Sequence, residues 1–273
     1  MRGARYFLLL GAVALSAGLA PAATPSPASM PQGYLTPGEF DVTHILEPAP
    51  RKGDPRYESD RKIFRATRAL RGTPRWDLAT KDAALSPKDM LRDYSCAVGI
   101  SMTPANTHAI STVLQRASMD TLRQMSRAKE YYKRSRPYFI DRGEICQPRA
   151  ELGHSYDYPS GHTTWGWTWG LILASLAPDR AQPILERARA YGDSRFICGA
   201  HNESAVEAGK LAASATMALV QTKPAYQADL AAACAEMDAL RADPATPRPD
   251  HCEAEAALVN ERVMPKLDAT RRH

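Results

Sequence analysis

The sequence has no large excess of charge of either sign, which limits what composition alone can indicate about ligands. Its 273 residues include 35 Lys and Arg against 30 Asp and Glu, a formal net charge of +5. Removing Arg2 and Arg5 with the expected leader leaves 33 basic and 30 acidic residues. So small a surplus does not by itself indicate a nucleic-acid-binding protein. It is compatible with an anionic ligand wherever basic side chains converge locally.

Motifs that bind metal ions are also missing. The patterns C-x-x-C and H-E-x-x-H do not occur, so the sequence offers no strong metal site, and we expect no metal or other cofactor. The 16 glycines and 21 prolines follow no fixed period, which excludes collagen-like and low-complexity chains. With 44% hydrophobic and 24% charged residues, the chain has the composition of a folded protein and is long enough to bury a sizeable core.

Beyond the N-terminus, no apolar run is long enough to span a membrane. The nearest candidate, residues 165–177, is interrupted at Pro178. The N-terminus itself carries two arginines, a short apolar stretch and the sequence Ala20-Pro21-Ala22, which has the A-x-A form of a cleavage site. This pattern predicts a signal peptide over residues 1–22, cleaved near Ala22-Ala23, and therefore a periplasmic or secreted protein. A retained N-terminal anchor is the alternative.

Five cysteines follow the expected leader: Cys96, Cys146, Cys198, Cys234 and Cys252. In an oxidising compartment they can form at most two disulfides and leave one thiol. Cys234 and Cys252 flank a proline-rich turn and could fasten the C-terminal tail. A bridge between Cys96 and Cys146 is a weaker prediction, because spacing alone does not determine connectivity.

Apolar residues at three- and four-residue spacing predict an all-α fold with a single domain, and alternating strand patterns are scarce. The helices expected in this way cover residues 56–70, 86 onward, 107–134, 160–177, 179–192, 204–220 and 225–240. Two of them begin with capping signals: Ser86 stands before Pro87, and Ser204 with Glu207 forms a capping-box pattern. Arg136-Pro137 should end the longest helix, because proline cannot continue it.

Composition divides the chain into four expected segments. Residues 1–22 form the signal peptide, and residues 23–55, rich in Pro, Gly, Ser and Thr, form an extended or loosely packed arm. Residues 56–230 form the main helical domain, and residues 231–273 form a helical tail that a disulfide could fasten. No internal repeat is present.

Three blocks of basic and imidazole residues lie close to expected helix ends. They are Lys129 with Arg136-Pro137, then Pro159-Ser160-Gly161-His162, and finally Ser194-Arg195 with His201. Each block alone has an ordinary structural explanation. A basic residue late in a helix interacts with the macrodipole, Ser-Gly caps a helix, and a lone histidine is more often structural than catalytic.

Taken together, the three blocks have the chemistry that phosphoryl transfer requires. That reaction needs cations around three equatorial oxygens, an in-line nucleophile and an acid on the leaving oxygen. Lys129, Arg136 and Arg195 can supply the cations, and arginine has paired donors that match phosphate geometry. Backbone amides at a Ser-Gly helix start can bind an anion, and two histidines can divide the nucleophile and acid roles. This set of groups requires no metal ion.

In order and spacing, the three blocks resemble the tripartite signature of the phosphatidic acid phosphatase type 2 superfamily. More narrowly, the chain resembles the bacterial class A non-specific acid phosphatases. Residues 66–76, 94–97 and 196–199 add to this resemblance, which covers roughly residues 35–230. It implies a helical bundle of the acid phosphatase and vanadium haloperoxidase type, so that residues 56–230 would be the phosphatase domain. The site would lie where helix ends and loops meet.

The resemblance also implies a role for each matching residue. His201 would be the nucleophile that forms a phosphohistidine, and His162 the acid that protonates the leaving alcohol and then activates water. The remaining matches would bind the phosphate oxygens: Lys129, Arg136, Arg195, Ser160 and Gly161, with His162 beside them. The expected substrate is a small phosphomonoester and the product inorganic phosphate, without a metal cofactor, a dedicated nucleic-acid partner or a membrane span after cleavage. A homo-oligomer remains open.

One position departs from the family pattern. The family places an aspartate four residues after the nucleophilic histidine, where this chain has Ala205. Such an aspartate fixes the imidazole tautomer and stabilises its positive form, and alanine cannot accept a hydrogen bond. Glu203, Glu207 or a backbone carbonyl could substitute, with Glu207 the first candidate, although a cap with Ser204 is its more ordinary role.

This departure leaves two alternatives to a fully active phosphatase. The first is a phosphate-binding protein with weak or no turnover, in which the anion site is intact but the histidine is misoriented. The second is a vanadium-dependent haloperoxidase, because those enzymes resemble the superfamily in their anion site.

Overall fold

The computed structural model describes residues 31–264, and within that range every regular element is a helix. This confirms the predicted all-α fold. The predicted signal peptide over residues 1–22 lies outside the described residues, as does the end of the tail from residue 265. The division of the sequence into four segments stays a prediction.

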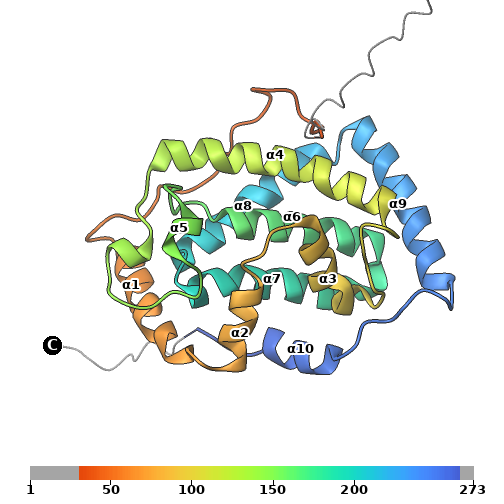
Figure 1. The fold of residues 1–273 in the computed structure, drawn as a ribbon. Helices are drawn as coiled ribbons and strands as arrows, with labels where there is room; N and C mark the ends of the chain where they lie inside the picture. Colours follow the sequence, from red (N-terminus) through yellow and green to blue (C-terminus); the bar gives the residue numbers. More distant parts are fainter. Residues whose placement is uncertain (1–30, 265–273) are drawn as a thin grey trace, which may run out of the picture. The chain divides into compact units, whose positions relative to one another are not determined.

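Most of the helices lie over the predicted ranges, with differences at some of their ends, whereas the helices at Pro74–Lys81 and Arg149–Leu152 were not predicted (Figure 1). Their bounds are α1 Pro55–Thr67, α2 Pro74–Lys81, α3 Pro87–Val98, α4 His108–Tyr132, α5 Arg149–Leu152, α6 Gly161–Leu176, α7 Ala181–Cys198, α8 Glu203–Val220, α9 Pro224–Ala242 and α10 Cys252–Val259. The predicted cap of α3 is confirmed: the Ser86 hydroxyl accepts the backbone N–H of Asp89 at 3.1 Å.

Helix α6 lies at the centre and packs against α4, α7 and α8, while α9 packs on α4 (Figure 1). Two glycines bring α6 close to α7: a Cβ on Gly166 would lie 2.5 Å from the Tyr191 ring, and one on Gly170 would lie 2.5 Å from Ala188 Cβ. Only a short connection joins α6 to α7, so the two helices run antiparallel. The start of α6 and the end of α7 therefore lie at the same end of the core.

That same end also holds the start of α8. The backbone N–H of Ser160, the residue before α6, donates to the carbonyl of Ala205 in the first turn of α8 at 2.8 Å. A Cβ on Gly209 of α8 would lie 2.8 Å from the Ser160 carbonyl oxygen, so glycine permits this close approach. The predicted second and third blocks thus meet through backbone contacts.

The predicted ends of two helices are wrong. Helix α7 continues six residues past Gly192 to Cys198, because Gly192 serves close packing: a Cβ there would lie 2.9 Å from Thr163 Cγ2. Helix α4 ends at Tyr132, before the predicted stop at Arg136-Pro137. Its cap, Lys133, has a positive φ of 49° and its N–H bonds the carbonyl of Lys129.

A further expectation about local structure is also wrong. Asn202, not Ser204, stands at the N-cap of α8, because the Ser204 hydroxyl is engaged by Asp60 instead. The described part of the N-terminal arm packs against the helical core. Leu35 and Val42 are buried, and Asp120 of α4 accepts the N–H of Leu35 at 3.2 Å.

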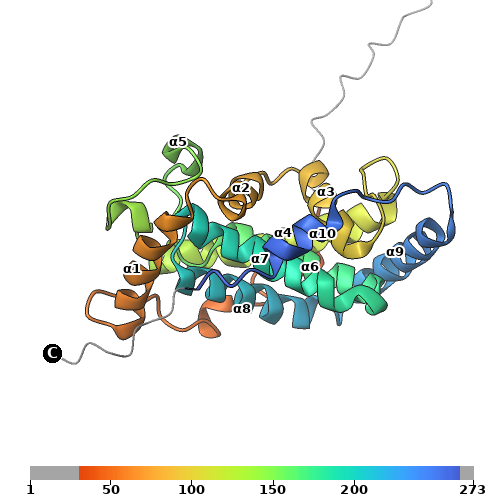
Figure 2. The ribbon, with the colours of Figure 1, turned by 90° about the horizontal axis from the view of Figure 1, so that it is seen from below.

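The structure forms two disulfides and leaves one thiol, as expected, but the predicted pairs are wrong. Cys96 pairs with Cys252 and Cys146 pairs with Cys198, while Cys234 is free. The reason is tertiary: α10 packs against α2, α3 and α7, as Figure 2 shows from below, and this brings Cys252 to Cys96. The tail is therefore fastened to α3.

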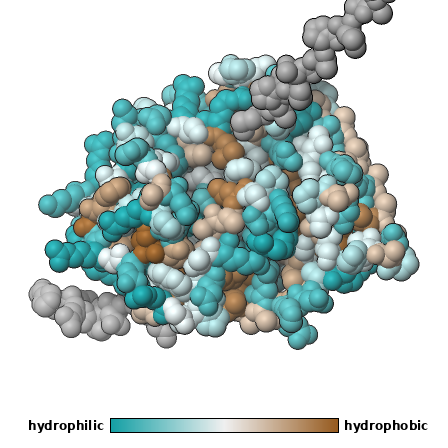
Figure 3. All heavy atoms as spheres, in the orientation of Figure 1, coloured by the Kyte–Doolittle hydropathy of each residue, from teal (hydrophilic) through white to brown (hydrophobic). Residues whose placement is uncertain are grey.

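Among residues 31–264, no helix is both long and apolar enough to cross a membrane. Figure 3 shows that hydrophilic side chains dominate one face and that hydrophobic ones form small separate patches.

Candidate active site

The five side chains predicted to carry the chemistry lie together at the shared end of α4, α6, α7 and α8. Arg136 Nη1 lies 3.0 Å from His201 Nε2. Lys129 and Arg136 both contact Ser155: Lys129 Nζ donates to its hydroxyl at 2.9 Å, and Arg136 Nε donates to its carbonyl at 2.7 Å. The charge of Arg195 lowers the pKa values of both His162 and His201, so Arg195 lies near both imidazoles.

The imidazole of His201 has a different environment at each ring nitrogen. Nε2 faces Arg136 Nη1, which can only donate, so Nε2 is the acceptor and carries the lone pair. Nδ1 lies 2.8 Å from the carbonyl oxygen of Asp157 and 3.1 Å from its Oδ1, both acceptors. These contacts assign the proton to Nδ1 and the lone pair to Nε2, on the side of the ring that faces the cations.

Burial and positive charge keep His201 neutral. The ring is 2% exposed, and burial is the largest cause that lowers its pKa well below the usual value. Arg136, Lys129 and Arg195 lower this pKa further, because a second positive charge is disfavoured near them. The neutral imidazole therefore persists below the usual pKa of histidine.

Three buried cations surround this imidazole. Burial and the charge of Arg136 lower the pKa of Lys129 to about 7. Burial lowers the pKa of Arg195 to about 10. Arg195 Nη2 donates to Gln147 Oε1 at 2.8 Å, whereas its Nε and Nη1 meet no acceptor within residues 31–264. Buried donors without acceptors cost about 1–3 kcal/mol each, so this arrangement favours binding of an anion.

The start of α6 lies beside these cations. The Ser160 hydroxyl accepts from the Thr163 hydroxyl at 2.9 Å and caps the helix, and the Ser160 N–H is bound by α8. Its side chain is thus engaged within the protein. The amides of Gly161 and His162 begin the helix, and the first amides of a helix have no partner inside it. They are the better placed of the predicted anion-binding groups.

His162 is hydrogen-bonded to the loop between α2 and α3, which lies outside the three sequence blocks. Its Nε2 lies 3.0 Å from the carbonyl oxygen of Ala83, so Nε2 carries a proton and donates. Burial, followed by the charge of Arg195, lowers the pKa of His162 well below its usual value. The preceding residue, Asp82, accepts from the Ser194 hydroxyl at 2.6 Å, which ties this loop to α7. Ser194 therefore positions His162 through the loop.

The end of α7 is held by a second group of residues outside the three blocks. Arg68 donates to the carbonyls of Phe196 and Cys198 at 3.2 and 3.3 Å, where a cation stabilises the helix C-terminus. The disulfide from Cys146 to Cys198 fixes the adjacent loop, whose Gln147 accepts from Arg195. Both contacts hold Arg195 and the turn before His201 in place.

Neither glutamate considered as a substitute for the missing aspartate contacts His201 in the structure. Glu207, the first candidate, pairs with Lys210 at 2.7 Å and has a side chain that is 49% exposed. The predicted role of Glu207 is therefore wrong. The alternative of a backbone carbonyl is present, at Asp157, together with a carboxylate that the sequence reading missed.

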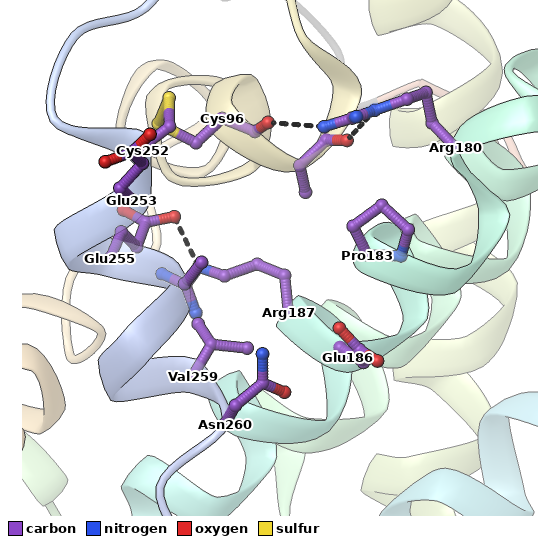
Figure 4. Close-up of a pocket in the computed structure, with 12 residues that line it drawn as sticks. Cys96, Arg180, Pro183, Glu186, Arg187, Cys252, Glu253, Glu255, Val259 and Asn260 are labelled. Atoms are coloured by element: carbon purple, nitrogen blue, oxygen red, sulfur yellow. Dashed lines mark hydrogen bonds and ion pairs between the residues drawn. A yellow bond between two sulfur atoms is a disulfide. The ribbon is translucent and has the colours of Figure 1, made fainter.

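The described residues offer no metal site, and one cavity lies away from the predicted site residues. Within residues 31–264, no group of three or more His, Cys, Asp or Glu side chains could hold a metal ion. A cavity of about 220 Å³ lies between α10 and α7, next to the disulfide from Cys96 and an ion pair of Arg187 with Glu255 (Figure 4). None of the predicted site residues lines it.

The chain is similar to characterised families over most of its length. The PAP2 superfamily matches residues 104–227. An acid phosphatase of Zymomonas mobilis subsp. mobilis is 38% identical over 79% of this chain and 82% of its own. Non-specific acid phosphatases of Salmonella typhimurium and Providencia stuartii are 36% and 32% identical, over 73% and 70% of this chain and 82% and 78% of theirs. The chain belongs to the PAP2 superfamily and, within it, to the bacterial acid phosphatases.

Proposed function

We propose that this protein hydrolyses small phosphate monoesters through a phosphohistidine intermediate on His201. The observation that carries the proposal is the buried guanidinium of Arg195, with two N–H groups that meet no acceptor among residues 31–264, next to an imidazole with its lone pair on Nε2. A tetrahedral anion fits these donors and brings its phosphorus to the nucleophile.

The reaction proceeds in two steps. In the first, His201 Nε2 attacks phosphorus, the bond to the leaving oxygen breaks, and His162 protonates that oxygen to release the alcohol. In the second, His162 accepts a proton from water, the hydroxide attacks phosphorus, and the phosphorus–nitrogen bond breaks to release inorganic phosphate. Lys129, Arg136 and Arg195 stabilise the negative charge on the equatorial oxygens, with the amides of α6 beside them.

A bound phosphate ester also changes the pKa of His162, the proposed acid. Without an anion, burial, followed by the charges of Arg195, His201 and Arg136, lowers the pKa of His162. The negative charges of a phosphate ester act against these positive charges and raise the pKa, because an anion favours the protonated imidazole. A bound ester therefore favours the form of His162 that can donate a proton to the leaving oxygen.

We further propose that the reaction needs no metal ion and takes place outside the cytoplasm. Three cationic side chains already supply the charge that a metal would contribute. Two disulfides favour an oxidising compartment, and the N-terminal pattern favours export with cleavage near Ala22-Ala23.

The proposal is tested with residues 23–273 and a chromogenic phosphate ester at acidic pH, with and without a chelator. We expect turnover that the chelator leaves unchanged, and an acid-quenched phosphohistidine. His201→Ala should lower kcat by at least ~10⁴-fold and abolish the trapped phosphoenzyme, as expected for the loss of a nucleophile. His108→Ala, an exposed histidine at the start of α4, is the control and should keep the wild-type rate.

Three outcomes would contradict the proposal. Phosphate binding without turnover would indicate a binding protein, and halide oxidation by the vanadate-loaded protein would indicate a haloperoxidase. Wild-type turnover in His201→Ala would exclude His201 as the nucleophile.

A further inference from the structure

On the edge of the His201 ring opposite Arg136, Nδ1 is hydrogen-bonded to one residue, Asp157. Both its carbonyl oxygen and its Oδ1 accept from His201 Nδ1, at 2.8 and 3.1 Å. Asp157 is fully buried and lies two residues before Pro159 in the loop that leads into α6. The carboxylate thus approaches the imidazole from the loop just before the second sequence block, not from α8.

Donors face both oxygens of this carboxylate. Oδ1 also accepts the backbone N–H of Asn202 at 3.1 Å, and Oδ2 accepts the Asn202 amide at 2.8 Å and lies 3.4 Å from Arg134 Nη1. Burial raises the pKa of Asp157, while Arg134 and Asn202 act in the opposite direction. Since every neighbour donates, the carboxylate is arranged as an acceptor for Nδ1–H.

A buried network keeps the carboxylate from turning away. The backbone N–H of Asp157 donates to the Arg134 carbonyl at 2.9 Å. The Arg134 guanidinium forms an ion pair with Asp60 at 2.7 Å, and Asp60 accepts the N–H of Ser204 at 2.9 Å. Helix α1, the loop before α6 and the start of α8 are therefore joined around one fixed carboxylate.

Position 205 is consistent with this arrangement. Ala205 is fully buried in an apolar cluster with Tyr158, Ala128 and Ala208. A carboxylate there would have to enter apolar surroundings, which is unfavourable. The alanine at 205 therefore suits its neighbours, and the carboxylate that meets His201 is that of Asp157.

We infer that Asp157 is the positioning residue for His201 and supplies, from the loop before α6, the carboxylate that the family pattern places at position 205. It holds the proton on Nδ1, directs the Nε2 lone pair toward the cations and stabilises the positive charge that develops as Nε2 bonds to phosphorus. The backbone carbonyl can hold the tautomer but carries no charge. This inference rests on the proposed function of His201.

The test removes the negative charge at position 157 and then introduces one at position 205. Asp157→Asn should lower kcat by ~10²–10⁴-fold, as loss of an orienting carboxylate does in a triad. KM and inhibition by inorganic phosphate should change little, because Lys129, Arg136 and Arg195 are untouched. Adding Ala205→Asp to this variant should recover part of the lost kcat, whereas Ala205→Asp in the wild-type chain should give no gain.

Asp60→Asn is the matched control, since it removes a carboxylate from the same network without contacting His201. We expect a much smaller loss of kcat. An equal loss in Asp60→Asn would assign the effect to the network and overturn the inference. A wild-type kcat in Asp157→Asn, with turnover that still depends on His201, would overturn the inference while leaving the proposed function intact.

A measurement on the unaltered protein covers the case in which Asp157→Asn fails to fold. Nitrogen NMR of the ¹⁵N-histidine-labelled chain, with the His201 signal assigned from His201→Gln, reports which ring nitrogen carries the proton. We expect Nδ1–H. A proton on Nε2 in the neutral ring would overturn the inference.

Discussion

The two ends of the helical core are buried to a similar degree, but one end contains apolar side chains and the other contains charged side chains. At one end, Trp169, Leu173 and Ile110 are fully buried among apolar neighbours. At the other, Lys129 and Arg195 are almost as inaccessible but carry positive charge. Burial stabilises the first end, since apolar surface leaves water. At the second end burial of the charges opposes folding; Asp157 offsets part of this cost for Lys129, and an anionic ligand would offset more.

This contrast indicates that the fold and the chemistry are supported by different parts of the same helices. Helix α6 begins at the charged end with His162 and ends in the apolar core beyond Trp169. Helix α7 runs the opposite way and ends at the charged end with Arg195. Substitutions at the charged end should therefore change rates, and substitutions at the apolar end should change stability.

The largest expected effect of this kind, beyond His201, concerns the acid at the start of α6. His162→Ala should lower the rate by ~10²–10⁴-fold for alkyl phosphates, because an alkoxide is a poor leaving group without a proton. Esters with good leaving groups should lose much less. The measurement is kcat across a series of leaving groups of different pKa. An equal loss for every ester would contradict the acid role.

The next effect tests the apolar end. Leu173→Ala should destabilise the protein by about 2–5 kcal/mol, because it leaves a cavity in a fully buried cluster. The kcat per folded molecule should stay close to that of the wild type. Urea unfolding and active-site titration measure the two quantities separately. If kcat per folded molecule fell together with stability, the two ends would not be independent.

The smallest expected effect is a shift in pH dependence. Burial and Arg136 lower the pKa of Lys129 to about 7, so Lys129 is charged below this pH and neutral above it. Because the neutral amine binds phosphate less well, kcat/KM should fall as the pH rises through about 7. In Lys129→Arg this fall should move to higher pH, since arginine holds its proton more strongly.

Lys133→Arg, at an exposed position four residues away, is the control for this experiment and should leave the pH profile unchanged. The lowered pKa of His201 predicts that the nucleophile stays neutral as the pH falls below its usual value. An alkaline limb that does not move in Lys129→Arg would show that another group is responsible for it.

Features that depend on neighbouring residues could be predicted from the sequence. The apolar spacing of α4 and the Ser86-Pro87 start of α3 act within a few turns of one helix, and both predictions are confirmed. The three blocks also indicated that Lys129, Arg136, His162, Arg195 and His201 lie together, because each stands in or next to a helix end at the same end of the core.

Features that depend on long-range packing could not be predicted in this way. The capping pattern at Ser204 is present, but Asp60 and Arg134 engage that hydroxyl from other parts of the chain. The cysteine pairs likewise follow from where α10 lies. Asp157 carried a usable signal only in its position just before Pro159, and nothing local shows that it faces His201.

The sequence by itself therefore determined the helices, the identity of the chemical groups and their positions at helix ends, since these follow from short-range periodicity and side-chain chemistry. Only the tertiary structure decided which carboxylate meets the nucleophile and which cysteines pair. Hydrogen bonds and disulfides require a few ångströms of proximity, and residues such as Asp157 and His201 come within that distance only when separate helices pack.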